Sequence, residues 1–220
     1  MKTRRFLLLF VLFLLFCPSL IWSQSDLLFT NSQKIDQERY EDILDSPYLL
    51  DDWLPGKITD QDAEQIEAPA MNYNAHSHTF EVRKGERFIE LDPTGYVRIV
   101  LTMTEKDSMV FQKPTHPAIQ GNFMQLLYEG EGQLFKQVES KISKKTFQDV
   151  GKTREVERFV ARTTYHWVKA DLHKRFKMSK KSIIKTFGNK KEVEAFLKKN
   201  KLKLSSDENL ARLFAHLDRG

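Results

Sequence analysis

Apolar and polar side chains alternate with a period of two between Gly56 and about residue 143. Val97, Ile99 and Leu101, which share one parity, give the clearest example. This alternation predicts strands with one buried face, and the apolar segments are too closely spaced to leave room for helices between them. Strands that are joined only by short turns must run antiparallel. We therefore expect an antiparallel meander that curls into an open barrel or half-barrel, because curling protects the edges of a sheet.

The expected β-rich region spans residues 46–178 and contains one polar interruption. Between residues 133 and 143 the apolar side chains lie four apart, a spacing that is compatible with a helix as well as with a strand. Residues 144–153 are polar and are expected to form a connection. The expected strands and hairpins follow the order Ile58, 66–74, 79–91, 97–101, 108–112, 123–129, 156–168 and 172–178.

Up to three short amphipathic helices are expected in the basic C-terminal region, residues 179–220. Each has an apolar stripe at helical spacing and a polar residue that can cap its first turn. The candidate caps are Ser179 or Ser182 for the first helix, Asn189 with Glu192 for the second, and Ser205 with Glu208 for the third. Helices of two to three turns are too short to be stable alone, so they must pack on one another or on the sheet. The predicted fold class is α+β.

The first 25 residues have the layout of a secretory signal peptide. Basic residues precede an uncharged apolar run from Phe6 to Trp22, and small polar residues follow it. An uncleaved anchor is one alternative, and a lipoprotein signal with Cys17 as the acylated residue is another. Residues 26–45 are expected to form a polar segment in which 37–45 can make a short helix.

Cysteine usage bears on the compartment in which the protein works. Cys17 is the only cysteine, so cleavage of the signal would leave a mature chain without any. The chain also lacks an Asn-x-Ser/Thr glycosylation site. Secreted eukaryotic domains of this size usually carry disulfides. The two absences favour export to the periplasm or cell envelope of a Gram-negative bacterium, or secretion from one.

Charge is distributed unevenly along the chain. Residues 26–71 have a net charge of −9, and residues 140–220 have a net charge of +13. The acidic segment can lie against the basic region, or the basic region can bind an anionic partner. Anionic lipid, acidic glycan or an envelope protein would fit, whereas no aromatic-interleaved signature supports nucleic acid. Membrane association would be peripheral or through an uncleaved signal. The lysines of this candidate surface are Lys180, Lys181, Lys190, Lys191, Lys198, Lys199, Lys201 and Lys203.

Sequence motifs for common enzyme chemistry are missing. The chain has no Gly-x-Ser-x-Gly elbow, no His-Glu-x-x-His and no phosphate-binding Gly-rich loop, so we expect no cofactor. His76 and His78 lie two apart and could face one metal ion from an extended strand, with His116 as a third ligand. The alternative is a polar turn with exposed histidines. His166, beside Trp167 on an expected strand, can be structural or functional.

Acidic residues alternate at Asp60, Asp62 and Glu64. A calcium loop that starts at Asp60 would need Gly at its sixth position and Glu at its twelfth, where the chain has Gln65 and Met71. The alternation therefore predicts an acidic turn between two strands.

Several short motifs resemble those of uncharacterised secreted proteins of Bacteroidota. The motifs are Trp53–Ile58, Met71–Asn74, Tyr128-x-Gly130, Tyr165, Lys180–Ile183 and Phe187–Lys191. The resemblance covers most of the mature chain and implies a Gram-negative envelope setting. It implies no activity and assigns no functional residues.

These observations predict a non-catalytic secreted or envelope protein, an interaction or structural module with a basic C-terminal surface. One alternative is an envelope-polymer hydrolase that uses carboxylates or histidines. It requires several side chains from the set His76, His78, His116, Asp60 and Asp62 to converge in a cleft. The second alternative is a secreted nucleic-acid-binding protein, whose binding would weaken with added salt.

Overall fold

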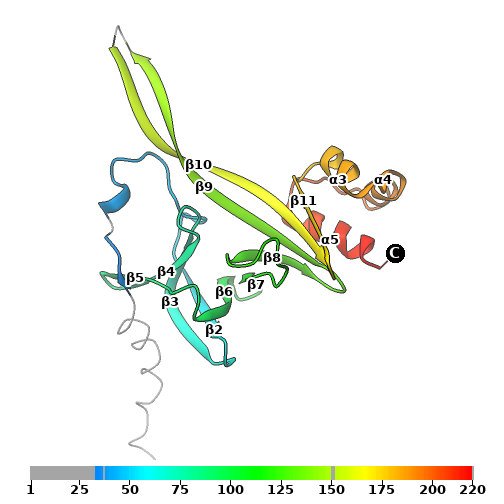
Figure 1. Ribbon diagram of the computed structural model, residues 1–220, viewed down its shortest axis with the longest axis horizontal. Helices are drawn as coiled ribbons and strands as arrows, with labels where there is room; N and C mark the ends of the chain where they lie inside the picture. The colour runs from blue at the N-terminus through cyan, green and yellow to red at the C-terminus, as the bar shows by residue number, and fades with distance from the viewer. Residues whose placement is uncertain (1–32, 37, 150–151, 220) are drawn as a thin grey trace, which may run out of the picture.

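The computed structural model describes residues 33–36, 38–149 and 152–219 (Figure 1). The expected signal peptide, residues 1–25, lies outside the described residues, as does the start of the polar segment that follows it. Within the described ranges, no helix combines the length and the apolar character needed to cross a bilayer.

The described residues form one antiparallel sheet of eleven strands, followed by three short helices. The strands are β1 (Gln33–Lys34), β2 (Leu54–Asp60), β3 (Gln65–Asn74), β4 (Thr79–Lys84), β5 (Arg87–Glu90), β6 (Tyr96–Thr104), β7 (Asp107–Gln112), β8 (Met124–Glu129), β9 (Gln133–Asp149), β10 (Lys152–Lys169) and β11 (Leu172–Phe176). The helices are α3 (Lys180–Phe187), α4 (Lys190–Lys199) and α5 (Asp207–Leu217), and a single 3₁₀ turn, η1 (Glu38–Tyr40), lies near the start. The predicted α+β class is confirmed.

The strand order across the sheet is β1-β5-β4-β3-β2-β6-β7-β8-β9-β10-β11. From β2 onward each strand pairs with its neighbour in the chain, except where the β5–β6 connection carries β6 to the free side of β2. The sheet does not close, because β1 and β11 remain at its two edges. An open, curled meander is therefore the observed architecture.

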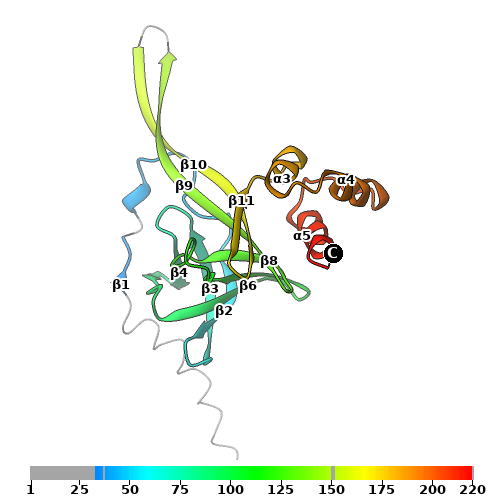
Figure 2. The same ribbon diagram turned by 45° about the vertical axis from the view of Figure 1, so that its right-hand side comes forward.

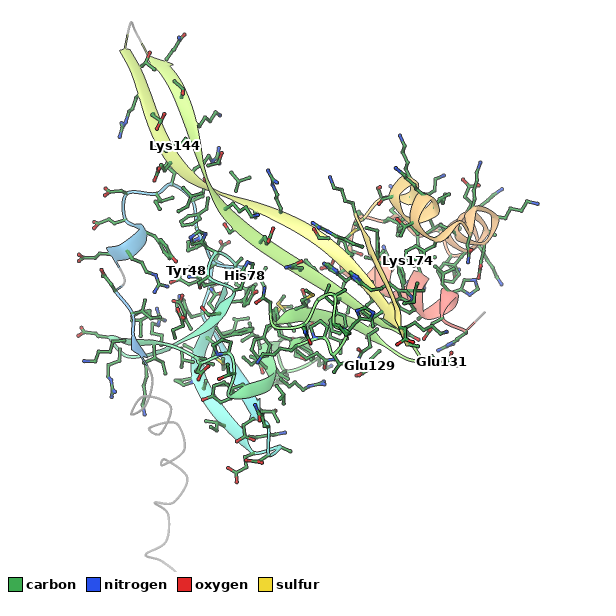
Figure 3. All side chains as sticks on the ribbon, in the orientation of Figure 1. Tyr48, His78, Glu129, Glu131, Lys144 and Lys174 are labelled. Atoms are coloured by element: carbon green, nitrogen blue, oxygen red, sulfur yellow. The ribbon has the colours of Figure 1, made fainter. Side chains whose placement is uncertain are left out.

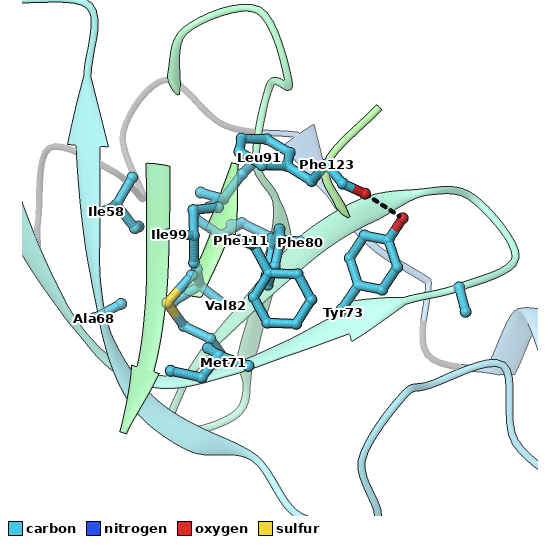
Figure 4. Packing of buried hydrophobic residues seen from close by; sticks show 13 residues of the cluster. Ile58, Ala68, Met71, Tyr73, Phe80, Val82, Leu91, Ile99, Phe111 and Phe123 are labelled. Atoms are coloured by element: carbon cyan, nitrogen blue, oxygen red, sulfur yellow. Dashed lines mark hydrogen bonds between the residues drawn. The ribbon is translucent and has the colours of Figure 1, made fainter. Parts of the chain in front are cut away.

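The main core lies inside the curl of β2 to β7 and follows from the alternation of apolar side chains. Ile58, Met71 and Ile99 are completely buried there (Figure 4). The rings of Phe80 and Phe111 meet edge to face at 5.1 Å between centroids. Such pairs add a directional contribution to the free energy gained by burying apolar area. The alternating apolar positions thus build one packed face of the sheet.

The prediction of a polar connection at residues 144–153 is wrong, because β9 and β10 continue through most of this segment as a long hairpin. Residues 133–143 are strand and not helix. In Figure 2 the distal part of this hairpin projects well beyond the rest of the sheet. Lys144, labelled in Figure 3, lies on this projection and pairs across the strands with Glu155 at 2.9 Å. A two-stranded ribbon in solvent has no buried face, so its sequence is polar and lacks the apolar alternation that marks a strand.

A second core joins the helices to the sheet. Phe214 of α5 packs against Trp167 of β10 and Phe176 of β11, with centroid distances of 5.0 and 5.1 Å. The ring of Phe187 in α3 lies 5.3 Å from the ring of Phe214, measured between centroids. Ile183 of α3 and the apolar side chains of α4 and α5 complete this cluster. The helices therefore pack on the sheet, as helices of this length require.

The helix starts differ in part from the expectation. Ser179 caps α3 and accepts a hydrogen bond from the Ser182 amide at 3.2 Å. The side chain of Asn189 does not cap α4 but donates to Glu192 at 3.2 Å. Ser206, and not Ser205, caps α5. The cap moved by one residue because two serines are adjacent, and only the geometry of the preceding loop selects between them.

The second core predicts a large difference between two leucine-to-alanine variants. Leu213 is completely buried in α5, whereas Leu172 at the start of β11 is 45 % exposed. Leu213→Ala should lower the free energy of unfolding by about 2–5 kcal/mol, the usual cost of a cavity in a packed core. Leu172→Ala should change it by less than about 1 kcal/mol. Urea unfolding followed by circular dichroism measures both, and equal losses would contradict this assignment of the core.

Candidate functional site

The eight lysines predicted from the sequence all lie on α3, α4 and the segment that follows α4. Every one of them is exposed. The apolar stripes of the helices are committed to the second core, where Ile183, Val193 and Leu210 are fully buried. Burial of that face leaves the polar face of each helix toward solvent, so the fold displays the lysines on the outer surface of the helical region. We call this set the lysine surface.

Ion pairs neutralise little of the lysine surface. Within the described ranges, Lys180 is the one member with a salt bridge, to Glu194 of α4 at 3.2 Å. Residues 179–219 contain eleven Lys and Arg against five Asp and Glu. Two of these carboxylates, Asp207 and Asp218, face the sheet and pair with lysines there. The surface therefore carries a net positive field that is open to an anionic partner.

Polar anchors fix α5 on the sheet at both of its ends. At the first turn, Asp207 accepts hydrogen bonds from Lys136 of β9 at 2.6 Å and from Tyr165 of β10 at 2.8 Å. Burial and the neighbouring carboxylate raise the pKa of Tyr165. At the last turn, Asp218 accepts from Lys169 at 3.0 Å and from the Tyr128 hydroxyl at 3.1 Å. The carboxylates thus set the position of α5 along β9 and β10.

The turn between β8 and β9 is shaped to receive Asp218. The Asp218 carboxylate also accepts a hydrogen bond from the Gly132 amide at 3.0 Å. Lys169 forms a second ion pair with Glu131, which is labelled in Figure 3. Burial alone would raise the pKa of Asp218, but the hydrogen bonds from Gly132, Lys169 and Tyr128 hold it below its ordinary value. A side chain at Gly132 would collide with Trp167, and one at Gly130 with Tyr128 and Asp218. Both positions require glycine.

Lys174 of β11 fixes the other end of the helical region. The ammonium group of Lys174, which is labelled in Figure 3, donates to the carbonyl of Thr186 at 3.2 Å, in the last turn of α3. It also lies over the Phe187 ring. A cation at a helix C-terminus stabilises the free carbonyls there. Lys174 therefore has a structural role and does not belong to the lysine surface.

A pocket of about 370 Å³ opens between α4 and α5, beside the lysine surface. The rings of Phe196 and His216 lie parallel in it, 4.4 Å apart at 12°. His216 Nε2 lies 3.6 Å from a carboxylate oxygen of Glu192. Of the residues that line the pocket, only Lys199 belongs to the lysine surface. No local sequence pattern predicts this pocket, because it depends on how two separate helices cross.

His76 and His78 are both in the β3–β4 turn, and each has a different partner. His76 Nδ1 lies 3.0 Å from the carbonyl oxygen of Ser140, and its ring packs against Phe159. His78 Nδ1 lies 3.3 Å from the Tyr73 hydroxyl, and its backbone has a positive φ of 62°. Burial is the main cause that lowers the pKa of His78. Among the described residues no third His, Cys, Asp or Glu completes a metal-binding group with this pair, and the metal site stays a prediction.

His116 lies in a different place, where it joins His166 and His173. His166 Nδ1 is 3.0 Å from His173 Nε2, and the two rings stack at 7°. The ring of His116 lies 5.4 Å from that of His173. Sequence reasoning missed His173, although strand pairing places it opposite Val168, two residues from His166. Across the described ranges, no group of three or more His, Cys, Asp or Glu side chains is positioned to hold a metal ion.

Asp60 ends β2, and Asp62 lies in the turn between β2 and β3. The Asp60 carboxylate accepts the backbone amides of Asp62 and Glu64, both at 2.9 Å. This is the acidic turn that the sequence predicts. No contact among the described residues joins these carboxylates to His76, His78 or His116, so the structure does not gather the residues named for a hydrolase.

The most deeply buried acid is Glu81 of β4, which the sequence did not single out. It accepts hydrogen bonds from Arg39 at 2.5 Å, Asn74 at 2.7 Å and Tyr48 at 2.8 Å. Burial and this carboxylate raise the pKa of Tyr48. Because Arg39 and Tyr48 come from the segment before β2, the network ties that segment to the sheet. Its groups satisfy one another, which is the signature of a structural ion pair.

Comparison of the chain with protein families, with curated proteins and with solved structures found no match.

The histidine cluster predicts how stability depends on pH. Burial, with contributions from His173 and Arg175, lowers the pKa of His166 from 6.5 to about 4. Between these values the unfolded chain binds a proton that the folded chain does not, so stability falls as the pH drops from about 6.5 toward 4. His166 alone should account for a loss on the order of 3 kcal/mol. Urea unfolding across this range measures it.

The control variant for this prediction is His166→Gln, which keeps a polar side chain beside Gln137 and His173. Its stability should decline less steeply than that of the wild type over the same pH range. Parallel decline of the two proteins would contradict a neutral buried His166.

Proposed function

We propose that this chain is an exported, non-catalytic binding protein whose lysine surface binds an acidic polysaccharide of a bacterial cell envelope. The observation that carries the proposal is the set of exposed lysines on α3 and α4, of which only Lys180 has an ion pair among the described residues. Crowded like charges repel one another, and an anionic polymer relieves that repulsion while it releases its counterions. The lysine surface is thus suited to a partner with repeated negative charges.

The packing of the helices favours a polysaccharide over a lipid surface. A helix that lies in a membrane interface presents an apolar face to the lipid. Here α3 and α5 pack their apolar stripes on the sheet and α4 packs its stripe against α3 and α5, so the exposed helix surface is mainly polar apart from the pocket beside Phe196. Lipid binding would therefore rest on charge alone, whereas a polysaccharide can also use hydrogen bonds from hydroxyl groups.

The hydrolase alternative receives no support from a specific arrangement in the described residues. Its named residues lie at the β2–β3 turn, in the β3–β4 turn and in the segment after β7. A glycosidase needs two carboxyl groups that face one sugar across a cleft. Asp60 and Asp62 instead lie at one tight turn, and the Asp60 carboxylate already accepts hydrogen bonds from two backbone amides.

Loss of charge from the lysine surface should weaken polymer binding. The variant Lys181→Gln/Lys191→Gln/Lys198→Gln removes three charges from α3 and α4. Its affinity for polygalacturonate should fall about tenfold or more, since each exposed contact contributes up to about 1 kcal/mol. The affinity of the wild type should also fall as salt is added. Biolayer interferometry on immobilised polymer measures both effects.

The matched control is Lys57→Gln/Lys106→Gln/Lys141→Gln, which removes the same charge from the sheet and the projecting hairpin. It should bind the polymer as the wild type does. Equal weakening of the two variants would show that only net charge matters, and absence of wild-type binding would contradict the proposed function.

A further inference from the structure

The pocket between α4 and α5 has the dimensions and lining of a small-ligand site. Its volume of about 370 Å³ falls within the range of roughly 300–1,000 Å³ that is usual for such sites. An aromatic pair forms one wall, and Ala195 extends the apolar surface. The polar side chains around it are Glu192, Lys199 and Asn200. An apolar wall with a few polar groups is the combination that orients a small molecule.

The groups that line the pocket are held in place before any ligand binds. Asn200 donates from Nδ2 to the Phe196 carbonyl at 2.9 Å, which joins the end of α4 to its preceding turn. His216 of α5 stacks on Phe196 of α4 and approaches Glu192, so the two rings together form one wall that joins the helices. The anchors of α5 on the sheet fix the position of His216 in this wall. A preformed site loses little conformational entropy on binding.

The unused polar atoms indicate what the pocket can recognise. Asn200 uses its amide nitrogen in the structure, and its amide oxygen makes no hydrogen bond to any described residue. Glu192 accepts from Asn189 at 3.2 Å and retains further acceptor capacity. These acceptors suit hydroxyl donors. The ammonium group of Lys199 has no partner among the described residues and suits an anion.

We propose that this pocket binds a single sugar ring that carries one anionic group, either the carboxylate of a uronic acid or a phosphate. The apolar C–H face of the ring packs on the Phe196–His216 wall, its hydroxyls donate to Glu192 and Asn200, and its anionic group pairs with Lys199. Because Glu192 repels negative charge, the site favours one anion per ring over densely sulfated sugars. This inference rests on the proposed function and makes the pocket the specific subsite beside the lysine surface.

Trigalacturonate is the probe that tests the pocket, with neutral galactotriose as its counterpart and galactose 6-phosphate as the phosphate source. Isothermal titration with Lys199→Met, which keeps an apolar stem but removes the charge, should show about tenfold weaker binding of trigalacturonate. Lys106→Met, which removes the same charge from the β6–β7 turn outside the lysine surface, should bind within about twofold of the wild type. His216→Ala should weaken trigalacturonate binding as well, because it removes half of the aromatic wall.

Circular dichroism and thermal unfolding of the three variants establish that each is folded. Equal effects of Lys199→Met and Lys106→Met would overturn the pocket, because loss of net charge alone would then explain the weaker binding. Binding of galactotriose as tight as that of trigalacturonate would also overturn it. If trigalacturonate and galactose 6-phosphate both fail to bind while polygalacturonate binds, the pocket is wrong and the proposed function stands. Failure of the polymer too would contradict both.

Discussion

The contact of Phe214 with Trp167, Phe176 and Phe187 is the interaction on which the helical region depends. It joins α5, two strands and α3 in one apolar cluster, and it fixes which face of each helix is buried. The opposite face of each helix is therefore exposed to solvent, and on α3 and α4 this face carries the lysines. Without this cluster three helices of eight to eleven residues would not be stable, and neither the lysine surface nor the pocket would exist.

Charged side chains fix the position of α5 on the sheet more closely than the apolar cluster alone. Asp207 and Asp218 face the sheet at opposite ends of α5, and each is paired with a lysine and a tyrosine hydroxyl. Apolar contact is non-directional, so it allows a helix to slide or rotate, whereas hydrogen bonds at both ends do not. The position of α5 in turn sets the distance of His216 from Phe196. The pocket is thus a consequence of anchoring between helix and sheet.

Sequence reasoning predicted the fold where burial leaves a regular pattern and missed it elsewhere. The alternation around Ile99 predicted strands, and the stripe through Leu213 predicted α5. The distal part of β9 and β10 has the sequence pattern of a polar connection, because a solvent-exposed ribbon has no buried apolar face. The lysines were predicted because charge is visible in composition. The pairing of Phe196 with His216, and the cluster around His173, depend on packing between separate elements and leave no local signal.

The lysine surface and its neighbouring pocket are proposed to bind anionic sugars. Titration of trigalacturonate into ¹⁵N-labelled protein, followed by backbone amide shifts, tests this proposal most directly. The largest shifts should occur in α4, in residues 200–203 and around His216, and the strands of the main core should be unaffected. Shifts centred on the β9–β10 hairpin or on the main core, or no saturable shifts at all, would contradict it.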